Sequence, residues 1–386
     1  MASFRKFKAD NIFTGTEMLD GDNVLIVNEK GTVEAICPIP EAGEEIELIK
    51  GILSPGFINC HCHLELSIFK NKIPRQTGLA DFIKNDFKLR PLLASEENQT
   101  AMVQAAGDLY TSGTMAVGDI CNTSLSLPAK MNSPLQWKNF VEVSGFIPSV
   151  AEERLDEATS IRRAFKDQLL HSQVVPHAPY SVSEKLFRLI NEDSRGKLIS
   201  IHNQEAAAEN EFFLSGTGDF TSLYKTLGLN IEDFTVPGKR SIAWWLPFFD
   251  QGQSIISVHN SFTKGEDLAF AVAYAKEKLA AIYYCLCPRA NLYIDNCVPP
   301  VPLLRACKQD IVLGTDSYAS NDSLDIWGEI LQLQQSFPEI PLGEMLGWAT
   351  LNGAIALGLQ ESLGSFEAGK IPGVLQIHKN KVTRIL

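Results

Sequence analysis

The stretch Gly51–Ser67, GILSPGFINCHCHLELS, sets the fold and carries the first reactive side chains. Apolar residues lead into Ser54-Pro55-Gly56, and an apolar run then resumes before His61-Cys62-His63. Because residues two apart in an extended strand point to the same side, both imidazoles share one face. Two neutral imidazoles on one face form half of a site for a borderline metal such as zinc. The remaining ligands are then expected at the ends of other strands.

Beyond Ser54 the sequence alternates between short apolar strands and helices. Seven further strands are expected at 115–120, 140–143, 173–177, 198–202, 254–259, 281–287 and 311–316. Helices are expected at 95–110, 151–165, 322–335 and 342–357, with capping boxes at Ser181 and Thr263 and an apolar stripe of Leu268, Val272, Ala275 and Leu279.

Eight strands alternating with helices over about 300 residues match the requirements of a closed (β/α)8 TIM barrel. An open doubly wound sheet would carry a glycine-rich phosphate loop after its first strand, and this sequence has none. The fold class is therefore predicted to be α/β, with a barrel at its centre.

Both ends of the chain have a different pattern. Residues 24–27 and 33–36 flank a turn at Gly31 and predict a hairpin, and residues 374–377 and 381–385 again resemble strands. Chain ends often lie close together, so the two ends are expected to complete one small β-domain. The expected boundaries are 1–53 and 359–386 for this β-domain and 54–358 for the barrel.

Composition restricts the possible partners. The chain has 386 residues, 45% of them hydrophobic and 21% charged, which is typical of globular proteins. A net charge of −12 without a basic block disfavours binding to nucleic acid or to an anionic membrane. The sequence contains no long apolar run and begins without the apolar core of a signal peptide, so a cytoplasmic location is expected.

Eight cysteines in a chain of this length do not indicate a secreted disulfide scaffold. Cys60 and Cys62 flank the histidine pair, and Cys285 and Cys287 alternate along a later strand. These pairs allow a second interpretation, as thiolate ligands. Small buried side chains explain the same alternation, and this is the interpretation we favour.

The predicted strands share a chemical feature at their ends. The chain has seven histidines, and five of them end a predicted strand, while an aspartate ends the last strand: His61, His63, His177, His202, His259 and Asp316. In a (β/α)8 barrel the carboxyl ends of all strands meet on one face, where the active site is built. The sequence therefore predicts a metal site on this face. His171 and His378 are interpreted as surface residues.

The pattern resembles the amidohydrolase superfamily, in particular the branch of cytosine, guanine and S-adenosylhomocysteine deaminases and of triazine hydrolases. The resemblance covers nearly the whole chain and is carried by seven motifs: Pro55–Asn59 before the His-Cys-His, His177–Ser181, His202–Glu205, Val258-His259, Cys287–Asn291, Gly314–Asp316, and Asn352–Ala354 with Leu357-Gly358. It implies a distorted (β/α)8 barrel and a β-sandwich built from both termini. Gly369–Gly373 departs from the family's Gly-Lys-x-Ala-Asp.

The resemblance also implies roles for individual residues. His61, His63, His202 and Asp316 would hold one divalent metal, with zinc first and iron as the alternative. His177 would face the substrate, Glu205 would transfer protons, and His259 would act beside Asp316 on the hydrolytic water. Binuclear relatives carry a modified lysine at the end of the fourth strand. Residues 173–177 contain no lysine, so a mononuclear site is expected.

This donor set is suited to hydrolysis. A metal held by three imidazoles and one carboxylate keeps a position for water and lowers the pKa of that water towards about 7. The resulting metal-bound hydroxide would attack an amidine carbon, and protons would have to reach a ring nitrogen and the departing ammonia. Two weaker interpretations remain open: Glu205 as a solvated glutamate that begins a helix, and Asp316 as a metal ligand without a catalytic role.

The sequence thus predicts a metal-dependent hydrolytic deaminase of an amino-substituted heterocycle. The candidate small-molecule substrates are a purine, a pterin, a pyrimidine, or an adenine-nucleoside-like compound such as aminodeoxyfutalosine. The alternative is hydrolysis of another C–N bond or of a C–Cl bond at the same site, and the third interpretation is an inactive barrel that serves as a structural subunit. A homodimer is compatible with the size of the chain.

Overall fold

Parallel strands alternate with helices through most of the computed structural model, which describes residues 4–231 and 234–386. Within the described residues, two four-stranded parallel sheets form the centre of the molecule. The first has the spatial order β11-β10-β9-β8, with β8 at Phe57–Cys62, β9 at Thr114–Cys121, β10 at Gln136–Val143 and β11 at His171–Pro176. The second has the order β12-β13-β14-β15, at Leu198–Asn203, Ser254–His259, Ala281–Leu286 and Asp310–Leu313. The predicted α/β class is confirmed.

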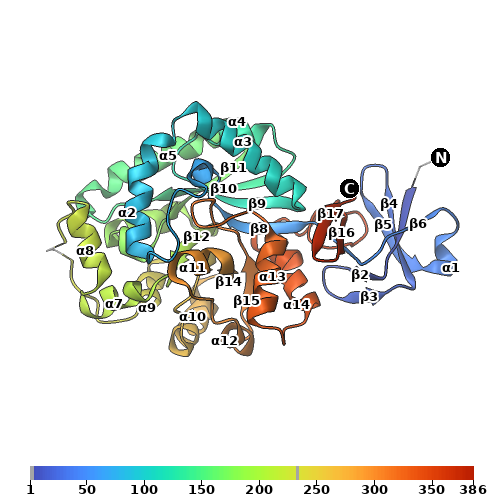
Figure 1. Ribbon diagram of the computed structural model, residues 1–386. Helices are drawn as coiled ribbons and strands as arrows, with labels where there is room; N and C mark the ends of the chain where they lie inside the picture. The colour runs from blue at the N-terminus through green and yellow to red at the C-terminus, as the bar shows by residue number, and fades with distance from the viewer. Residues whose placement is uncertain (1–3, 232–233) are drawn as a thin grey trace.

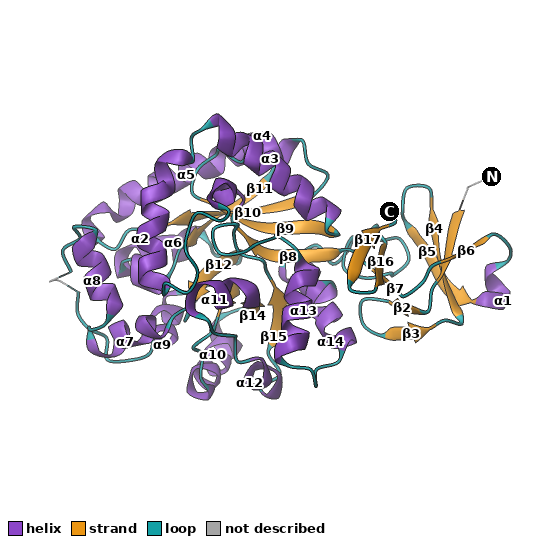
Figure 2. Ribbon diagram, viewed as in Figure 1, coloured by secondary structure: helices purple, strands orange, loops and turns teal. Residues whose placement is uncertain are grey.

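Helices surround these sheets (Figure 2). They are α2 (Leu79–Leu89), α3 (Glu96–Thr111), α4 (Leu127–Met131), α5 (Ala151–Asp167), α6 (Glu184–Asp193), α7 (Ala207–Ser215), α8 (Asp219–Thr226), α9 (Ser241–Trp245), α10 (Gly265–Lys278), α11 (Pro288–Asp295), α12 (Val301–Ala306), α13 (Ile326–Ser336), α14 (Leu342–Ala349) and α15 (Leu351–Ala356). Among the described residues, no helix is long and apolar enough to cross a membrane.

The core lies between these strands and helices. Ile58, Val141, Val175, Ile256 and Val312 belong to one hydrophobic cluster and have no exposed surface. Every residue of β8 is buried, which explains why its sequence does not alternate between apolar and polar residues. Strands buried on both faces cannot slide without exposing apolar surface, so the core fixes where each strand ends.

The two ends of the chain share a sheet. Its spatial order is β17-β16-β7-β2-β3, with bounds Lys381–Arg384, Leu375–His378, Ile52–Ser54, Asn11–Phe13 and Met18–Asp20. A second sheet has the order β5-β4-β1-β6, with bounds Val33–Pro38, Asn23–Asn28, Phe4–Lys8 and Ile46–Leu48, and the short helix α1 (Ile39–Ala42) follows β5. The predicted hairpin is confirmed by the antiparallel pair β4 and β5. Figure 1 shows both sheets together at one end of the molecule.

Two predicted helix caps are wrong, and both errors have the same cause. Ser183, not Ser181, is the N-cap of α6, and its side chain accepts a hydrogen bond from the Leu186 amide. Lys264 takes the cap position expected for Thr263. The hydroxyl of Ser181 bonds the imidazole of His177, and that of Thr263 donates to a buried glutamine. The hydroxyl groups expected to cap these helices thus form hydrogen bonds with polar side chains near the strand ends instead.

Two predicted helices also differ in detail. Val272 in α10 is 48% exposed, whereas Leu268 and Ala271 are buried, so the inward face is rotated from the expected stripe. The helix expected at 342–357 is interrupted at Thr350, which lies between α14 and α15 and donates its hydroxyl proton to the Leu346 carbonyl. A side chain that bonds the preceding turn in this way weakens the helical ladder.

A buried ion pair links β9 to α4. Lys130 Nζ lies 2.5 Å from Asp119 Oδ2 and 2.7 Å from Asn139 Oδ1, and neither charged side chain has exposed surface. Burial alone would lower the pKa of Lys130, but the charge of Asp119, the Cys121 thiol and the hydrogen bonds to both together outweigh burial and hold the pKa above its ordinary value. Asp119 also accepts a hydrogen bond from the Leu64 amide, directly after the His-Cys-His. This pair therefore supports the segment that carries the histidines.

We predict that Lys130→Met lowers the free energy of unfolding by about 3–5 kcal/mol, because it leaves a buried carboxylate without its partner. Urea titration measures the change. The matched control is Lys84→Met, since Lys84 pairs with the largely exposed Asp81 and should contribute less than about 1 kcal/mol. A loss for Lys130→Met as small as that of the control would contradict the prediction.

Candidate metal centre

The first and last strands of the two parallel sheets meet at the histidine pair. The backbone amides of Thr315 and Asp316 both donate to the His61 carbonyl, each at 3.0 Å. Asn59 adds a side-chain hydrogen bond to the Thr315 hydroxyl at 2.8 Å. These bonds place Asp316, which follows β15, beside His61, at the end of β8.

Four side chains direct donor atoms toward one point. The Nε2 atoms of His61 and His63 lie 3.1 Å apart, and those of His63 and His202 lie 3.3 Å apart. Asp316 Oδ1 is 3.5 Å from His63 Nε2 and 3.7 Å from His61 Nε2. A tetrahedral zinc ion with bonds of about 2.0–2.1 Å separates its ligand atoms by about 3.3 Å. The spacing of these donors therefore fits one such ion.

In two of the ligands, a hydrogen bond occupies the side-chain atom that faces away from the other donors and leaves the second atom free to bind a metal. His202 Nδ1 donates to the His177 carbonyl at 2.8 Å, so neutral His202 presents the lone pair of Nε2. Ser320 Oγ donates to Asp316 Oδ2 at 2.5 Å and leaves Oδ1 for a metal. Glu142, His177 and His202 form a second group of possible ligands. A second ion there would need His202 Nδ1, which already carries a proton, so the geometry favours one metal.

Burial and the neighbouring charges set the protonation states that metal binding requires. Burial, followed by the charges of neighbouring histidines, holds the pKa of His202 well below its ordinary value, and burial lowers the pKa of His63. For Asp316 burial acts to raise the pKa, but the contact with His61 and the other nearby imidazoles hold the pKa of this carboxyl well below its usual range. Neutral imidazoles and an ionised carboxylate are the forms that bind a cation.

Glu205 and His259 lie next to these donors. Glu205 Oε1 is 3.5 Å from His259 Nε2, and both side chains are buried. Burial, followed by the charge of Asp316, raises the pKa of Glu205 well above its ordinary value. The Asn291 amide lies 3.0 Å from His259 Nδ1 and fixes the plane of the ring. The site thus pairs a carboxyl group whose pKa is raised by burial with an oriented imidazole.

His177 is the site histidine with partial exposure. Its Nδ1 lies 2.6 Å from Ser181 Oγ, and that hydroxyl donates its own proton to the Ala178 carbonyl. The serine oxygen must therefore accept from Nδ1–H. Neutral His177 consequently offers Nε2 as an acceptor, which suits contact with a substrate.

Strand ends in the second parallel sheet turn sharply into the site. Gln204, His259, Asn260 and Asp316 have φ angles of 48°, 70°, 58° and 57°, in the left-handed region that residues with a side chain seldom adopt. Such conformations persist where the surrounding structure holds them, and they gather at functional sites.

Three neighbours of the site were missed in the sequence. Glu142 in β10 accepts a hydrogen bond from Asn122 at 3.0 Å, and its other oxygen lies 3.5 Å from His202 Nδ1. Its signal was available, since a carboxylate interrupts the apolar run Phe140–Val143. Asn291 lies in the Cys287–Asn291 motif, but no role was expected for it. Ser320 follows Asp316 by four residues and has no sequence signal that distinguishes it.

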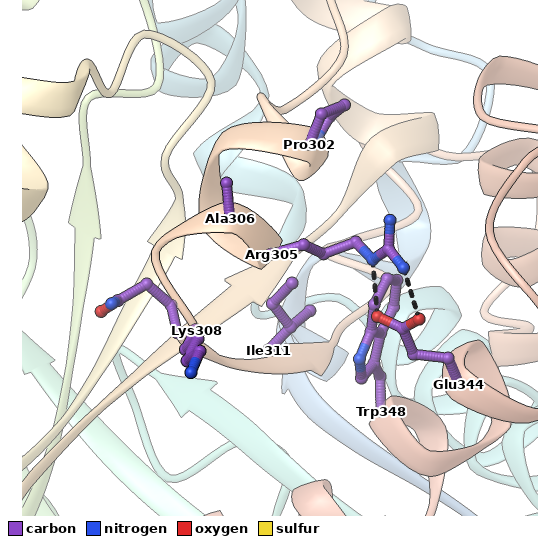
Figure 3. A pocket seen from close by; sticks show the side chains of 8 residues that line it. Pro302, Arg305, Ala306, Lys308, Ile311, Glu344 and Trp348 are labelled. Carbon is purple, nitrogen blue, oxygen red and sulfur yellow. Dashed lines mark hydrogen bonds and ion pairs between the residues drawn. The ribbon is translucent and has the colours of Figure 1, made fainter.

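A surface hollow lies away from this site. Figure 3 shows that α12, α14 and the start of β15 line it, with Arg305 forming a two-bond ion pair to Glu344 at 2.6 and 2.7 Å. Ile311 lies at the beginning of β15, whereas Asp316 follows the end of that strand. The hollow and the metal centre therefore belong to opposite ends of the strand.

The sequence and the fold are similar to those of known proteins. Residues 52–375 match the model of the amidohydrolase family. The 5-methylthioadenosine/S-adenosylhomocysteine deaminase of Teredinibacter turnerae is 26% identical over 358 residues, which cover 87% of this chain and 74% of that protein. The structure of Helicobacter pylori aminofutalosine deaminase with methylthio-coformycin has a TM-score of 0.80 at 22% identity, covering 97% and 93% of the two chains. The structure of an adenosine deaminase from Xanthomonas campestris with bound zinc has a TM-score of 0.70 at 18% identity, covering 96% and 83%.

Acidification should destabilise the metal-free protein. Burial lowers the pKa of His259 to about 3, whereas an unfolded histidine has a pKa of about 6.5. Below about pH 6.5 the unfolded chain therefore binds more protons, and stability falls as pH decreases towards 3. Between pH 7.5 and 5.5 this one group should remove about 1.4 kcal/mol.

Urea unfolding of chelator-treated protein at the two pH values measures this loss. In the His259→Asn variant the loss between pH 7.5 and 5.5 should be smaller by about 1.4 kcal/mol. An equal loss in the variant and the wild type would show that His259 does not titrate as its burial requires.

Proposed function

The chain belongs to the amidohydrolase family, and we propose that it is a metal-dependent hydrolytic deaminase of an amino-substituted heterocycle. The observation that carries the proposal is the cluster of four donor atoms spaced for one ion, next to a buried carboxyl group. The deaminase names of its relatives support the choice of reaction.

We propose that the two parallel sheets close into a distorted (β/α)8 barrel. Support comes from the bond of the His202 amide to the His177 carbonyl, which joins β11 to β12, and from the Asp316 amide bond to His61, which joins β15 to β8. We also propose that the terminal segments 1–53 and 359–386 form a β-sandwich beside the barrel of 54–358. Phe7, Leu25, Leu53 and Val374 from both terminal sheets belong to one hydrophobic cluster, which supports this division.

We assign His61, His63, His202 and Asp316 as ligands of one divalent metal, with zinc as the ion that the spacing favours. When bound, the metal lowers the pKa of a water molecule towards about 7 and makes it nucleophilic at neutral pH. Neutral imidazoles, an ionised carboxylate and the tautomer of His202 are consistent with this assignment.

The remaining site residues orient the substrate and move protons. Burial raises the pKa of Glu205, which favours its acid form, and in the proposed reaction this group delivers a proton to a ring nitrogen as the amidine carbon becomes tetrahedral. We assign His259, whose ring Asn291 orients and whose Nε2 lies 3.5 Å from Glu205 Oε1, to act beside Asp316 on the hydrolytic water. His177 presents Nε2 as an acceptor for a substrate N–H or O–H group. The departing amine leaves as ammonia once it has received the proton released by the water, and the hydroxyl proton of the adduct restores the Glu205 carboxyl group as the new carbonyl forms.

Adenine nucleosides are the substrate class that we place first. Three of the matched proteins are named for methylthioadenosine and S-adenosylhomocysteine, for aminofutalosine and for adenosine, which are adenine nucleosides or their derivatives. Hydrolysis of a C–Cl bond or of another C–N bond is the competing reaction, since triazine hydrolase structures also share this fold.

We further propose a cytoplasmic homodimer. All eight cysteines are free thiols, which suits a reducing compartment. The dimer is proposed because twofold assemblies are the commonest among soluble enzymes, and light scattering of the purified protein tests it.

The purified protein loaded with zinc should release ammonia from adenine nucleosides. The test panel contains methylthioadenosine, S-adenosylhomocysteine, adenosine, guanine, cytosine, a pterin and a chlorotriazine, with ammonia and chloride measured separately. Chloride release without ammonia would favour the competing hydrolase. Lack of any product, together with substoichiometric zinc, iron and manganese in the purified protein, would favour an inactive barrel.

We predict that Glu205→Gln keeps the metal and loses at least about 10²-fold in kcat, since an amide cannot deliver the proton. His202→Ala should lose both metal and turnover, because one of the four ligands is removed. Metal analysis and initial rates on the same samples distinguish the two variants. Normal turnover in Glu205→Gln would remove this residue from the mechanism.

A further inference from the structure

The turn that presents Glu205 has an unfavourable backbone conformation. Gln204, the residue before it, has a φ of 48°, and its side chain is fully buried. A long side chain in the left-handed region is costly, so this turn would relax if nothing held it. Any relaxation would redirect Glu205, because the backbone of Gln204 sets the direction of the following residue.

A second glutamate holds this turn. Glu209 in α7 is fully buried, and its Oε1 accepts a hydrogen bond from the Gln204 amide at 3.0 Å. The same oxygen accepts a short hydrogen bond from the hydroxyl of Ser241, at the start of α9. Glu209 thus connects the strained turn to two helices, which lie side by side in Figure 1.

The side chain of Gln204 is also held on both sides. Its Oε1 accepts a hydrogen bond from the Thr263 hydroxyl at 2.6 Å, and its Nε2 donates to Asn210 Oδ1 at 3.2 Å. Asn210 Oδ1 in turn accepts from the Ser241 amide at 3.1 Å. The network is buried, and Glu209 is its acidic member that bonds the backbone of the turn itself.

We propose that Glu209 is a positioning residue that fixes the direction of the Glu205 carboxyl group, an inference that rests on the proposed function. Its role is that of a hydrogen-bond acceptor. Burial raises the pKa of Glu209 to about 7 in spite of the hydrogen bonds from Ser241 and Gln204. Both bonds to Glu209 need only an acceptor oxygen, and a glutamine of the same shape can accept them.

Three variants test this role. The zinc content of each purified variant is measured, together with kcat and KM for methylthioadenosine. Glu209→Ala should keep zinc and KM within about threefold and lose about 10²-fold in kcat, the effect of a catalytic group displaced by about 1 Å. Glu209→Gln should recover kcat to within about fivefold of wild type, because the amide oxygen can accept from the Gln204 amide. The matched control is Glu211→Ala, on the same helix but exposed, which should change kcat less than twofold.

Equal losses in Glu209→Ala and Glu209→Gln would overturn the proposal, as would a Glu209→Ala enzyme with wild-type kcat. If Glu209→Ala does not accumulate as folded protein, Glu209→Gln and Ser241→Ala decide. Glu209→Gln is expected to keep kcat within about fivefold of wild type, and Ser241→Ala is expected to lose kcat several-fold at unchanged KM. Any other result contradicts the proposal.

Crystal structures separate this inference from the proposed function. If the wild-type enzyme deaminates none of the tested compounds, the proposed function fails but the positioning role can still be examined. Glu205 should stay beside His259 in the wild type and in Glu209→Gln, and it should turn away in Glu209→Ala with Gln204 leaving the left-handed region. An unmoved Glu205 in Glu209→Ala would overturn the inference.

Discussion

The site depends on one backbone contact, the acceptance of two amide hydrogen bonds by the His61 carbonyl. Thr315 and Asp316 donate these bonds, and through them the last parallel strand lies against the first. More than 250 residues separate the partners in sequence, so no local preference could bring them together. Once they are adjacent, Asp316 Oδ1 lies within 4 Å of two imidazole nitrogens. The buried strands of the core make this arrangement rigid, because a shift of register would expose apolar side chains.

Burial gives the site its chemical character. Burial lowers the pKa of His202 and raises the pKa of Glu205, while the groups around Asp316 hold the pKa of that carboxyl well below its usual range. The pKa values of two carboxyl groups in one small region are therefore shifted in opposite directions. The difference comes from their partners: Asp316 accepts a hydrogen bond from Ser320 and lies beside the imidazoles, whereas the partner that the structure shows for the Glu205 side chain, among the described residues, is His259 at 3.5 Å. The fold thereby favours the anion at Asp316, for binding, and the acid at Glu205, for proton transfer.

Much of this could be predicted from the sequence, because the chemical residues follow apolar strands and parallel strands end together. His61, His63, His202 and Asp316 could be placed in one site for that reason, while the resemblance to the amidohydrolase superfamily singled them out as ligands. The cap positions were not, since Ser181 and Thr263 bond distant polar groups that the local pattern does not reveal. The supporting residues were harder still to predict. Ser320 and Glu209 matter through partners chosen by the tertiary structure, and their surroundings in the sequence resemble those of ordinary surface positions.

The four donor atoms come from two sheets, and this has a structural consequence. His61 lies in β8 and His63 directly after it, while His202 lies in β12 and Asp316 follows β15 in the other sheet. A cation bound by all four side chains would link the two parallel sheets and stabilise the contact between them. Neither sheet supplies all four ligands. A fragment that stops before residue 198 lacks His202 and Asp316, so it would bind the ion only weakly. The same metal ion would then serve catalysis and hold the two sheets together.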